Sequence, residues 1–146
     1  MLMEVSEILK NLPYSAPFLF VEELLNVDEN GATGTFTFDK NLDFYKGHFK
    51  ENPVTPGVIL TETMAQIGLV CLGIFLVGNE LNSESQIGLT STEIEFLNPV
   101  YPGEKVTVIS DKIYFRFNKL KCRVKMWNEN SEIVCEGTIA GIIKVK

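Results

Sequence analysis

The stretch Gly47–Gln66, GHFKENPVTPGVILTETMAQ, runs from a loop punctuated by glycine and proline into the most apolar segment of the chain. From Val58 to Val77 almost every residue is apolar. Pro56 suits the first turn of a helix, where a missing N–H is harmless, and Gly78-Asn79 suits its end. The sequence therefore predicts one long helix that is apolar on nearly every side and must be covered by other elements.

The length of this helix would also permit a membrane crossing, which needs ~20 apolar residues. Four polar side chains lie in its first half, namely Thr61, Glu62, Thr63 and Gln66. A carboxylate at that depth in lipid is costly unless it has a functional role. We therefore expect a buried helix of a soluble protein and no membrane insertion.

The segments around the helix have the features of β-strands joined by tight turns. Thr35 and Thr37 alternate with Phe36 and Phe38, and Asn30-Gly31 is a strong turn signal. We expect a short helix at Ser6–Asn11, a loop at Lys46–Gly57, and strands at Leu19–Val27, Thr33–Phe38, Gln86–Leu97, Val106–Phe117, Lys121–Trp127 and Ile133–Val145. Tight turns join antiparallel neighbours, so the economical arrangement is an antiparallel sheet wrapped around one long central helix. This α+β layout is that of the hot-dog fold, with residues 1–146 as a single domain.

Charge and cysteine content argue against several classes of function. The formal net charge is −6, whereas a nucleic-acid binder normally carries a basic footprint. The three cysteines, Cys71, Cys122 and Cys135, are an odd number without CxxC spacing, so neither a disulfide framework nor a metal site is expected. Reduced thiols and an N-terminus without a signal-peptide pattern favour a cytoplasmic location.

Residues of the Gly47–Gln66 stretch suggest acid–base chemistry. His48 is the only histidine, and its ring can accept a proton near neutral pH. Glu62 lies in the most apolar helix, where a carboxylic acid can remain protonated and act as a general acid, although the nearby helix N-terminus favours the anion. Gln66 is four residues further on, so it shares a helix face with Glu62 and could orient it.

The start of the helix adds a third feature. Gly57 has no side chain, so a ligand can approach its N–H closely, and helix N-termini present unpaired N–H groups. A thioester carbonyl that gains negative charge would be stabilised there, as in an oxyanion hole. Taken alone, a surface histidine, an exposed glutamate and a tight turn would each be plain structural features. Together they suit removal of a proton beside a carbonyl with loss of a β-hydroxyl group.

The same stretch closely resembles the signature of the FabZ-type (3R)-hydroxyacyl-[acyl-carrier-protein] dehydratases, which reads approximately GHFPGNPVMPGVLxxEAMAQ. The shared residues are Gly47-His48-Phe49, Asn52-Pro53-Val54, Pro56-Gly57-Val58, Glu62 and Met64-Ala65-Gln66. The likeness also includes Leu12–Leu25 and Glu95–Val106, so it is not confined to one motif.

This resemblance implies a role for each site residue. His48 would remove the C2 proton, Glu62 would protonate or position the departing hydroxyl, and the Gly57 N–H would polarise the thioester carbonyl. Val58 and Gln66 would also contact the substrate. The product would be a trans-2-enoyl thioester, made in fatty-acid or in specialised polyketide or polyene synthesis. An acyl tunnel along the helix would be lined by Ile59, Leu60 and Phe75.

The resemblance also implies partners. The substrate would arrive on an acyl carrier protein through a phosphopantetheine arm, docked by the basic segment Lys119–Lys125 or by Lys46 and Lys50 near His48. In the family, the histidine and the acid come from different subunits of a dimer, and trimers of dimers also occur. No metal, cofactor or nucleic acid is implied.

Several positions depart from the family pattern. Near the start the family usually reads LPHRYPFLLVD, whereas this chain has Tyr14-Ser15 in place of His-Arg. Lys50-Glu51 replaces a usual Pro-Gly, and Thr55 replaces a common Met. These changes affect the expected acyl preference more than the reaction. Three alternatives remain: an (R)-specific enoyl-CoA hydratase, a hot-dog thioesterase, and a non-catalytic subunit that binds acyl thioesters.

Overall fold

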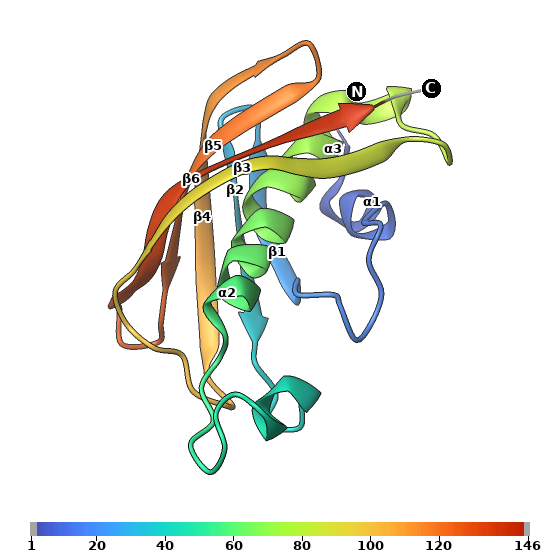
Figure 1. Cartoon of the computed structure of the whole chain (residues 1–146). Helices are drawn as coiled ribbons and strands as arrows, with labels where there is room; N and C mark the ends of the chain where they lie inside the picture. The colour runs from blue at the N-terminus through green and yellow to red at the C-terminus, as the bar shows by residue number, and fades with distance from the viewer. Residues whose placement is uncertain (1–2, 145–146) are drawn as a thin grey trace.

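The computed structural model describes residues 3–144 (Figure 1). Within these residues, two strands precede a long helix in the sequence and four strands follow it. The elements are α1 (Val5–Lys10), β1 (Glu23–Asp28), β2 (Gly31–Thr37), a 3-10 turn (Asp43–Lys46), α2 (Gly57–Met64), a π-helical segment (Ala65–Val70), α3 (Cys71–Val77), a second 3-10 turn (Gly78–Glu80), β3 (Gln86–Phe96), β4 (Lys105–Arg116), β5 (Lys119–Trp127) and β6 (Ile133–Lys144). The predicted last strand extends to Val145, which lies outside the described residues.

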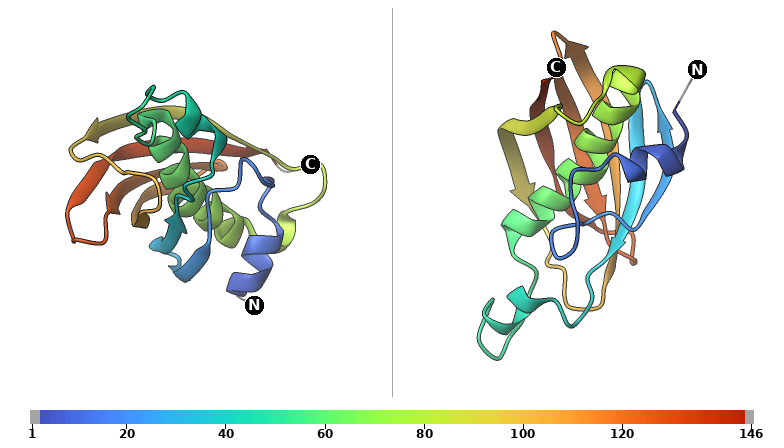
Figure 2. Two further views of the ribbon diagram at one scale, coloured as in Figure 1. Left: turned by 90° about the horizontal axis from the view of Figure 1, so that it is seen from below. Right: turned by 90° about the vertical axis from the view of Figure 1, so that its right-hand side faces the viewer.

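Within residues 3–144 the six strands form one antiparallel sheet in the order β1-β2-β4-β5-β6-β3. The sheet curls around the continuous helix Gly57–Glu80, called the central helix below (Figures 1 and 2). This helix is long and apolar enough to cross a membrane, with a mean hydropathy of 1.8, but 72% of its apolar window is buried inside the molecule. Its burial identifies it as the core helix of the fold, as the sequence predicts.

The strand periodicity explains how the sheet covers the helix. On β5 the side chains of Cys122, Val124 and Met126 are fully buried against the helix. The intervening residues Arg123 and Lys125 lie on the opposite side, where they reach solvent. Alternation with a period of two therefore gives this strand one apolar face and one charged face, as predicted.

Two glycines allow the sheet to approach the central helix closely. A Cβ atom on Gly68 would lie 3.0 Å from the Cβ of Ser110, and one on Gly34 would lie 2.8 Å from Cγ2 of Ile67. Both distances are tighter than ordinary van der Waals contact, so a larger residue would push helix and sheet apart. The middle of the central helix is thus fixed against β2 and β4.

The strand predicted at Leu19–Val27 begins only at Glu23. Upstream of it, the Phe20 N–H donates to Oε1 of Gln66 at 2.8 Å instead of to a neighbouring strand. A backbone donor that binds a side chain does not take part in a strand ladder, which explains the shorter strand. The other strands lie at their predicted positions, with ends shifted by a few residues.

The central helix is not a uniform α-helix, which the apolar pattern does not reveal. Its middle segment, Ala65–Val70, is π-helical, and all six of its residues are buried. In such a segment each N–H bonds the carbonyl five residues back, which widens the helix locally. π-Helical turns occur frequently at functional sites, and this one begins less than one turn after Glu62.

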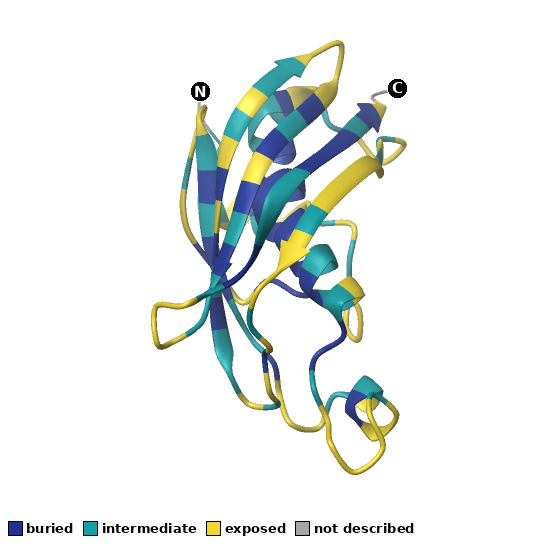
Figure 3. Ribbon diagram, turned by 60° about the vertical axis from the view of Figure 1, so that its left-hand side comes forward, coloured by how far each residue is buried: buried dark blue, intermediate teal, exposed yellow. Residues whose placement is uncertain are grey.

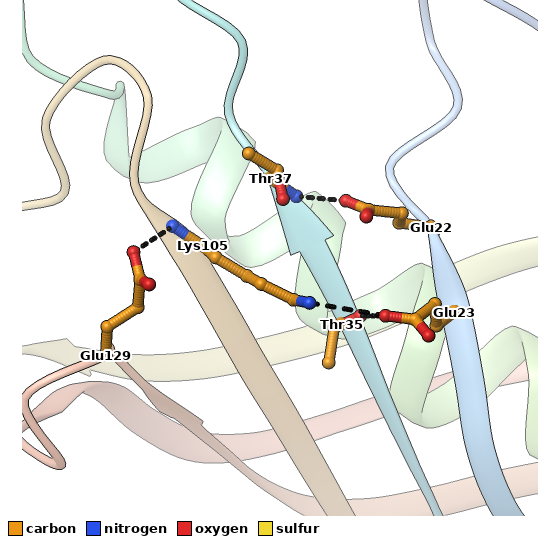
Figure 4. Close-up of polar contacts among 6 residues, drawn as sticks. All are labelled: Glu22, Glu23, Thr35, Thr37, Lys105 and Glu129. Carbon is orange, nitrogen blue, oxygen red and sulfur yellow. Dashed lines mark hydrogen bonds and ion pairs between the residues drawn. The ribbon is translucent and has the colours of Figure 1, made fainter.

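Polar side chains connect β1, β2 and β4 (Figure 4). The Glu23 carboxylate accepts hydrogen bonds from the Thr35 hydroxyl at 3.4 Å and from the Lys105 ammonium group at 3.2 Å. The Glu22 carboxylate accepts the Thr37 N–H at 2.9 Å, and the Glu129 carboxylate accepts the N–H of Lys105 at 3.1 Å. Exposed ion pairs contribute roughly 0–1 kcal/mol each, so these contacts add little to the stability that the buried interior provides.

The strand β3 lies at an edge of the sheet and pairs only with β6 within the described residues. It is 11 residues long and exposed along nearly its whole length (Figure 3). Leu89 and Phe96 on this strand are 44% and 50% exposed. Its free edge presents a row of backbone N–H and C=O groups that another strand can bind.

Candidate active site

Gln66 holds the Glu62 carboxylate in place. The Gln66 side chain is fully buried, and its Nε2 donates to Oε2 of Glu62 at 3.0 Å and to the Phe18 carbonyl at 3.1 Å. Its Oε1 accepts the Phe20 N–H at 2.8 Å. Because both ends of the amide are bound, it cannot rotate without breaking buried hydrogen bonds. The spacing of four residues does bring Glu62 and Gln66 into contact, and it gives the carboxylate one orientation.

Glu62 borders a cavity of about 280 Å³ between the central helix and the first half of β3. The other lining residues are mostly apolar: Tyr14, Phe18, Ala65, Leu69, Val70, Ile87, Gly88 and Leu89. Burial raises the pKa of Tyr14 to about 12, and the Glu62 carboxylate adds to this shift. The Tyr14 phenol therefore stays protonated at neutral pH and can donate a hydrogen bond beside Glu62.

His48 lies in the loop that follows the first 3-10 turn, and its ring is fixed by the backbone of the same loop. Its Nδ1 is 2.9 Å from the Val54 carbonyl, and the Val54 N–H donates to the His48 carbonyl at 2.9 Å. A carbonyl only accepts, so Nδ1 donates its proton, and in the neutral tautomer Nε2 keeps a lone pair. The ring also stacks on Phe49, with centroids 4.1 Å apart. This arrangement leaves Nε2 available as a base.

The base of this loop is anchored to the body of the molecule. The hydroxyls of Tyr45 and Thr55 are 2.5 Å apart and both residues are buried. The Thr55 N–H donates to the Val100 carbonyl at 2.8 Å. The Thr55 side chain, at a position where the family commonly has Met, is thus part of the support of the histidine loop.

Gly57 begins the central helix with unpaired backbone donors. The N–H groups of Ile59 and Leu60 donate to the Pro56 carbonyl, whereas those of Gly57 and Val58 have no acceptor within residues 3–144. Gly57 and Leu60 line a second cavity of about 380 Å³ with Phe96. A Cβ on Gly57 would lie 3.2 Å from the Phe96 ring, so a larger residue would crowd this cavity. The unpaired N–H groups of Gly57 and Val58 can stabilise a partial negative charge at the start of the helix.

A single chain does not bring His48, Gly57 and Glu62 into one cavity. Glu62 lines the cavity at β3, Gly57 lines the one at Phe96, and His48 lines neither. The loop with His48 extends away from the sheet at the N-terminal end of the central helix (Figures 1 and 2). The expected acyl-tunnel residues are also separated: Leu60 lines the cavity at Gly57, while Ile59 and Phe75 are partly buried against the core and line neither cavity.

Some residues of the Glu62 cavity were not identifiable as site residues from sequence. Tyr14 falls where the family usually has His-Arg, so only its departure from the pattern marks it. Leu69, Val70 and Ile87 are apolar residues in a helix and a strand, and nothing in their pattern distinguishes a cavity wall from ordinary core.

The other chemically notable features of residues 3–144 are three cysteines and a charged hollow. Residues 3–144 contain no cluster of three His, Cys, Asp or Glu side chains that could hold a metal ion. Cys71, Cys122 and Cys135 are buried, and burial raises the pKa of each thiol to about 12, so they stay protonated. A hollow of about 710 Å³ across β3, β5 and β6 is lined by charged side chains of both signs, among which Lys125 and Glu136 pair at 3.8 Å.

Comparison with known proteins identifies the family. The model of the FabA-like domain matches residues 12–144. A 3-hydroxyacyl-[acyl-carrier-protein] dehydratase FabZ from Caldicellulosiruptor saccharolyticus is 32% identical over 142 residues, which cover 97% of this chain and 99% of the relative. A FabZ from Sinorhizobium medicae is 33% identical over 147 residues, which cover 98% of this chain and 91% of the relative.

Solved structures share the fold at lower identity. A chain of the dehydratase heterocomplex ApeI:P from Xenorhabdus doucetiae has a TM-score of 0.78 at 14% identity, covering 100% of this chain and 94% of that one. A thioesterase from Haemophilus influenzae has a TM-score of 0.69 at 16% identity, covering 99% and 93%. These likenesses confirm the predicted hot-dog fold. The chain belongs to the FabA-like family and, within it, to the FabZ-type 3-hydroxyacyl-[acyl-carrier-protein] dehydratases, which are hydro-lyases.

Proposed function

From this family membership, we propose that the chain converts (3R)-hydroxyacyl-[acyl-carrier-protein] thioesters to trans-2-enoyl thioesters, with His48 and Glu62 as its acid–base pair. The observation that carries the proposal is that each group is held in one orientation, His48 by Val54 and Glu62 by Gln66. Dehydration needs both a base for a weakly acidic C2 proton and an acid for a hydroxide leaving group. His48 and Glu62 supply these two groups, each in a fixed orientation.

His48 acts as the base in this proposal. Its Nδ1–H donates to the Val54 carbonyl, so Nε2 takes the C2 proton. The electrons of the C2–H bond form the double bond between C2 and C3 while the C3–O bond breaks. The departing hydroxyl takes a proton from Glu62, directly or through a water, and leaves as water. Proton exchange with solvent then restores both side chains.

The start of the central helix stabilises the charge that develops on the thioester oxygen. The unpaired N–H of Gly57, with that of Val58 beside it, offers donors where the helix dipole is positive. Loss of one such donor in other enzymes costs ~10²–10³ in kcat. Leu60, in the same cavity, would contact the acyl group.

We infer that the complete site forms between two copies of the chain. His48 and Gly57 are separated from the Glu62 cavity in one copy, so a second copy must supply one side. The unpaired edge of β3 offers a place for it, since Gly88 and Leu89 on that strand also line the Glu62 cavity. A homodimer joined along β3, alone or as a trimer of dimers, would place the partner next to Glu62.

The remaining parts of the proposal concern partners and context. The named relatives are dehydratases of acyl-carrier-protein thioesters, so an acyl carrier protein is the proposed donor of the substrate. Lys46, which ends the 3-10 turn before His48, and Lys50 lie close to His48 in the sequence. Lys119–Lys125 forms a second basic segment, and either group could dock an acidic carrier. The pathway is fatty-acid synthesis or a specialised polyketide or polyene route in the cytoplasm.

One experiment tests the reaction. The purified chain is incubated with 3-hydroxyacyl thioesters on an acyl carrier protein and on CoA, and enoyl thioester is followed by mass and absorbance. We expect turnover on the carrier that falls roughly 10²–10⁴-fold in His48→Ala and in Glu62→Gln, as loss of a general acid or base does. Glu29→Gln, which changes an exposed glutamate in the β1–β2 turn, is the matched control and should keep full activity.

The outcomes distinguish the alternatives. Equal rates on CoA and carrier would favour an (R)-specific enoyl-CoA hydratase. Release of free acid would indicate a thioesterase. Substrate binding without turnover would indicate a non-catalytic acyl-thioester-binding subunit, and full activity in both variants would refute the assigned acid–base pair.

A further inference from the structure

The cavity beside Glu62 has a polar part and an apolar wall. Glu62 and Tyr14 line this cavity only. Leu69, Val70 and Ile87 line both it and a much narrower gap toward β5 and β6, which is distinct from the cavity at Gly57. These three residues therefore form the wall between the two spaces. A thioester with its 3-hydroxyl group at Glu62 would direct its alkyl tail away from the polar part and toward this wall, because Leu69, Val70 and Ile87 are apolar.

The space behind the wall is nearly closed. It holds about 10 Å³ and is lined on its far side by Leu120, Gly141, Ile142 and Ile143. A volume of ~10–15 Å³ is the least that can hold one water, and an apolar lining offers that water no hydrogen bonds. The wall therefore separates the open cavity from a dry gap in the core, into which a longer tail could extend only if the wall moved.

We propose that Leu69, Val70 and Ile87 form a stop that restricts this protein to short- and medium-chain 3-hydroxyacyl groups. The inference rests on the proposed function and names the substrate class of the same site. The cavity on the substrate side of the wall holds about 280 Å³ and the gap behind it about 10 Å³, so an acyl tail can lie only on the substrate side. A short or medium chain ends before the wall, whereas a long chain meets it.

The position of the stop is set from behind by Gly141 on β6. A Cβ atom at Gly141 would lie 2.8 Å from Cδ2 of Leu69, a contact that would force the leucine to move. Leu69 and Val70 also belong to the buried π-helical segment, so the backbone that carries them is held in the core. The stop is consequently a rigid feature of the fold.

The test compares kcat/KM for 3-hydroxybutanoyl, 3-hydroxyoctanoyl and 3-hydroxyhexadecanoyl thioesters on one carrier. The wild type should favour the two shorter substrates over hexadecanoyl by ~10-fold or more, the scale on which an apolar pocket rejects an extra group. Ile87→Ala joins the two spaces and should raise the hexadecanoyl-to-butanoyl ratio by ~10-fold or more. Gly141→Ala should lower the octanoyl-to-butanoyl ratio by moving Leu69 toward the substrate.

Ile94→Ala is the matched control, because Ile94 is a partly buried isoleucine on the same strand that lines neither cavity. It should leave the length profile unchanged, and Ile87→Val covers the case in which Ile87→Ala does not fold. A wild type equally active on all three chains, or an Ile87 variant that changes all rates in parallel, would overturn the stop. No dehydration of any of the three substrates by the wild type would instead refute the proposed function.

Discussion

The two proposed catalytic side chains are held by different kinds of structure. His48 is fixed within its own loop, since Val54, which binds its ring, is 6 residues away and the Tyr45–Thr55 contact spans 10. Glu62 is fixed through Gln66 to Phe18 and Phe20, which are 48 and 46 residues from that glutamine. The base is thus oriented mainly by contacts within its own loop, which Thr55 anchors to Val100, whereas the orientation of the acid depends on the packed core.

The largest effect is expected when His48 and Glu62 are supplied by different chains. His48→Ala and Glu62→Gln each have little activity alone. A mixture should regain about a quarter of wild-type activity when dimers exchange subunits, because half of randomly formed pairs are mixed and each mixed pair has one intact site. Turnover is measured after refolding an equimolar mixture. Mixing two preparations of the same variant is the control, and a mixture as inactive as its components would contradict a shared site.

Substitution of Gln66 tests whether the orientation of Glu62 depends on the packed core. Gln66→Leu should lower the free energy of unfolding by roughly 1–3 kcal/mol, because the buried Phe20 N–H loses its acceptor. Activity should fall as well, since Glu62 loses its fixed orientation. Urea unfolding and kcat are measured beside Gln86→Leu, an exposed glutamine at the start of β3. Unchanged stability would show that the hydrogen bond from Phe20 to Gln66 does not stabilise the fold.

The loop should respond in the opposite way, with a small loss of stability and a larger loss of activity. Thr55→Val removes the hydrogen bond to Tyr45 and should cost about 1 kcal/mol. Tyr45→Phe removes the same bond from the other side, so the double variant should be no worse than either single one. A double-mutant cycle on unfolding free energy and on kcat measures this coupling. Strict additivity would mean that the two hydroxyls act independently.

The last effect is absent at neutral pH and appears only as a dependence of stability on alkaline pH. Burial, and then the Glu62 carboxylate, raise the pKa of Tyr14 from 10.0 to about 12 in the folded chain. The unfolded chain therefore loses this proton first, so the contribution is complete below pH 10 and is lost as the pH rises toward 12. Tyr14→Phe should show a shallower loss of stability over this range than the wild type. Identical slopes for the two proteins would contradict the shift.

Much of the fold follows from local patterns in the sequence. The apolar run from Val58 and the alternation on β5 predict a buried helix and a strand with one charged face, because both depend on periodicity within one element. Local patterns do not predict the start of β1 or the π-helical turn. β1 starts late because the Phe20 N–H binds the Gln66 amide, which is far away in the sequence, and no local pattern predicts such a contact.

The candidate site divides in the same way. The spacing of Glu62 and Gln66 predicts their contact, because residues four apart on a helix are neighbours. The cavity wall formed by Leu69, Val70 and Ile87 arises where a helix meets a strand that is distant in the sequence, so only the folded structure reveals it. The separation of His48 from Glu62 in one chain likewise follows from tertiary arrangement.

The open edge of β3 has an evolutionary consequence. A strand edge is recognised through N–H and C=O groups that every polypeptide has, so pairing along it depends on shape and register more than on side-chain identity. In the proposed dimer, discrimination against a related chain would come from the exposed side chains of that strand, including the apolar Leu89 and Phe96. After a gene duplication, two such chains in one cell would form mixed pairs until these residues diverged, even if both kept His48 and Glu62.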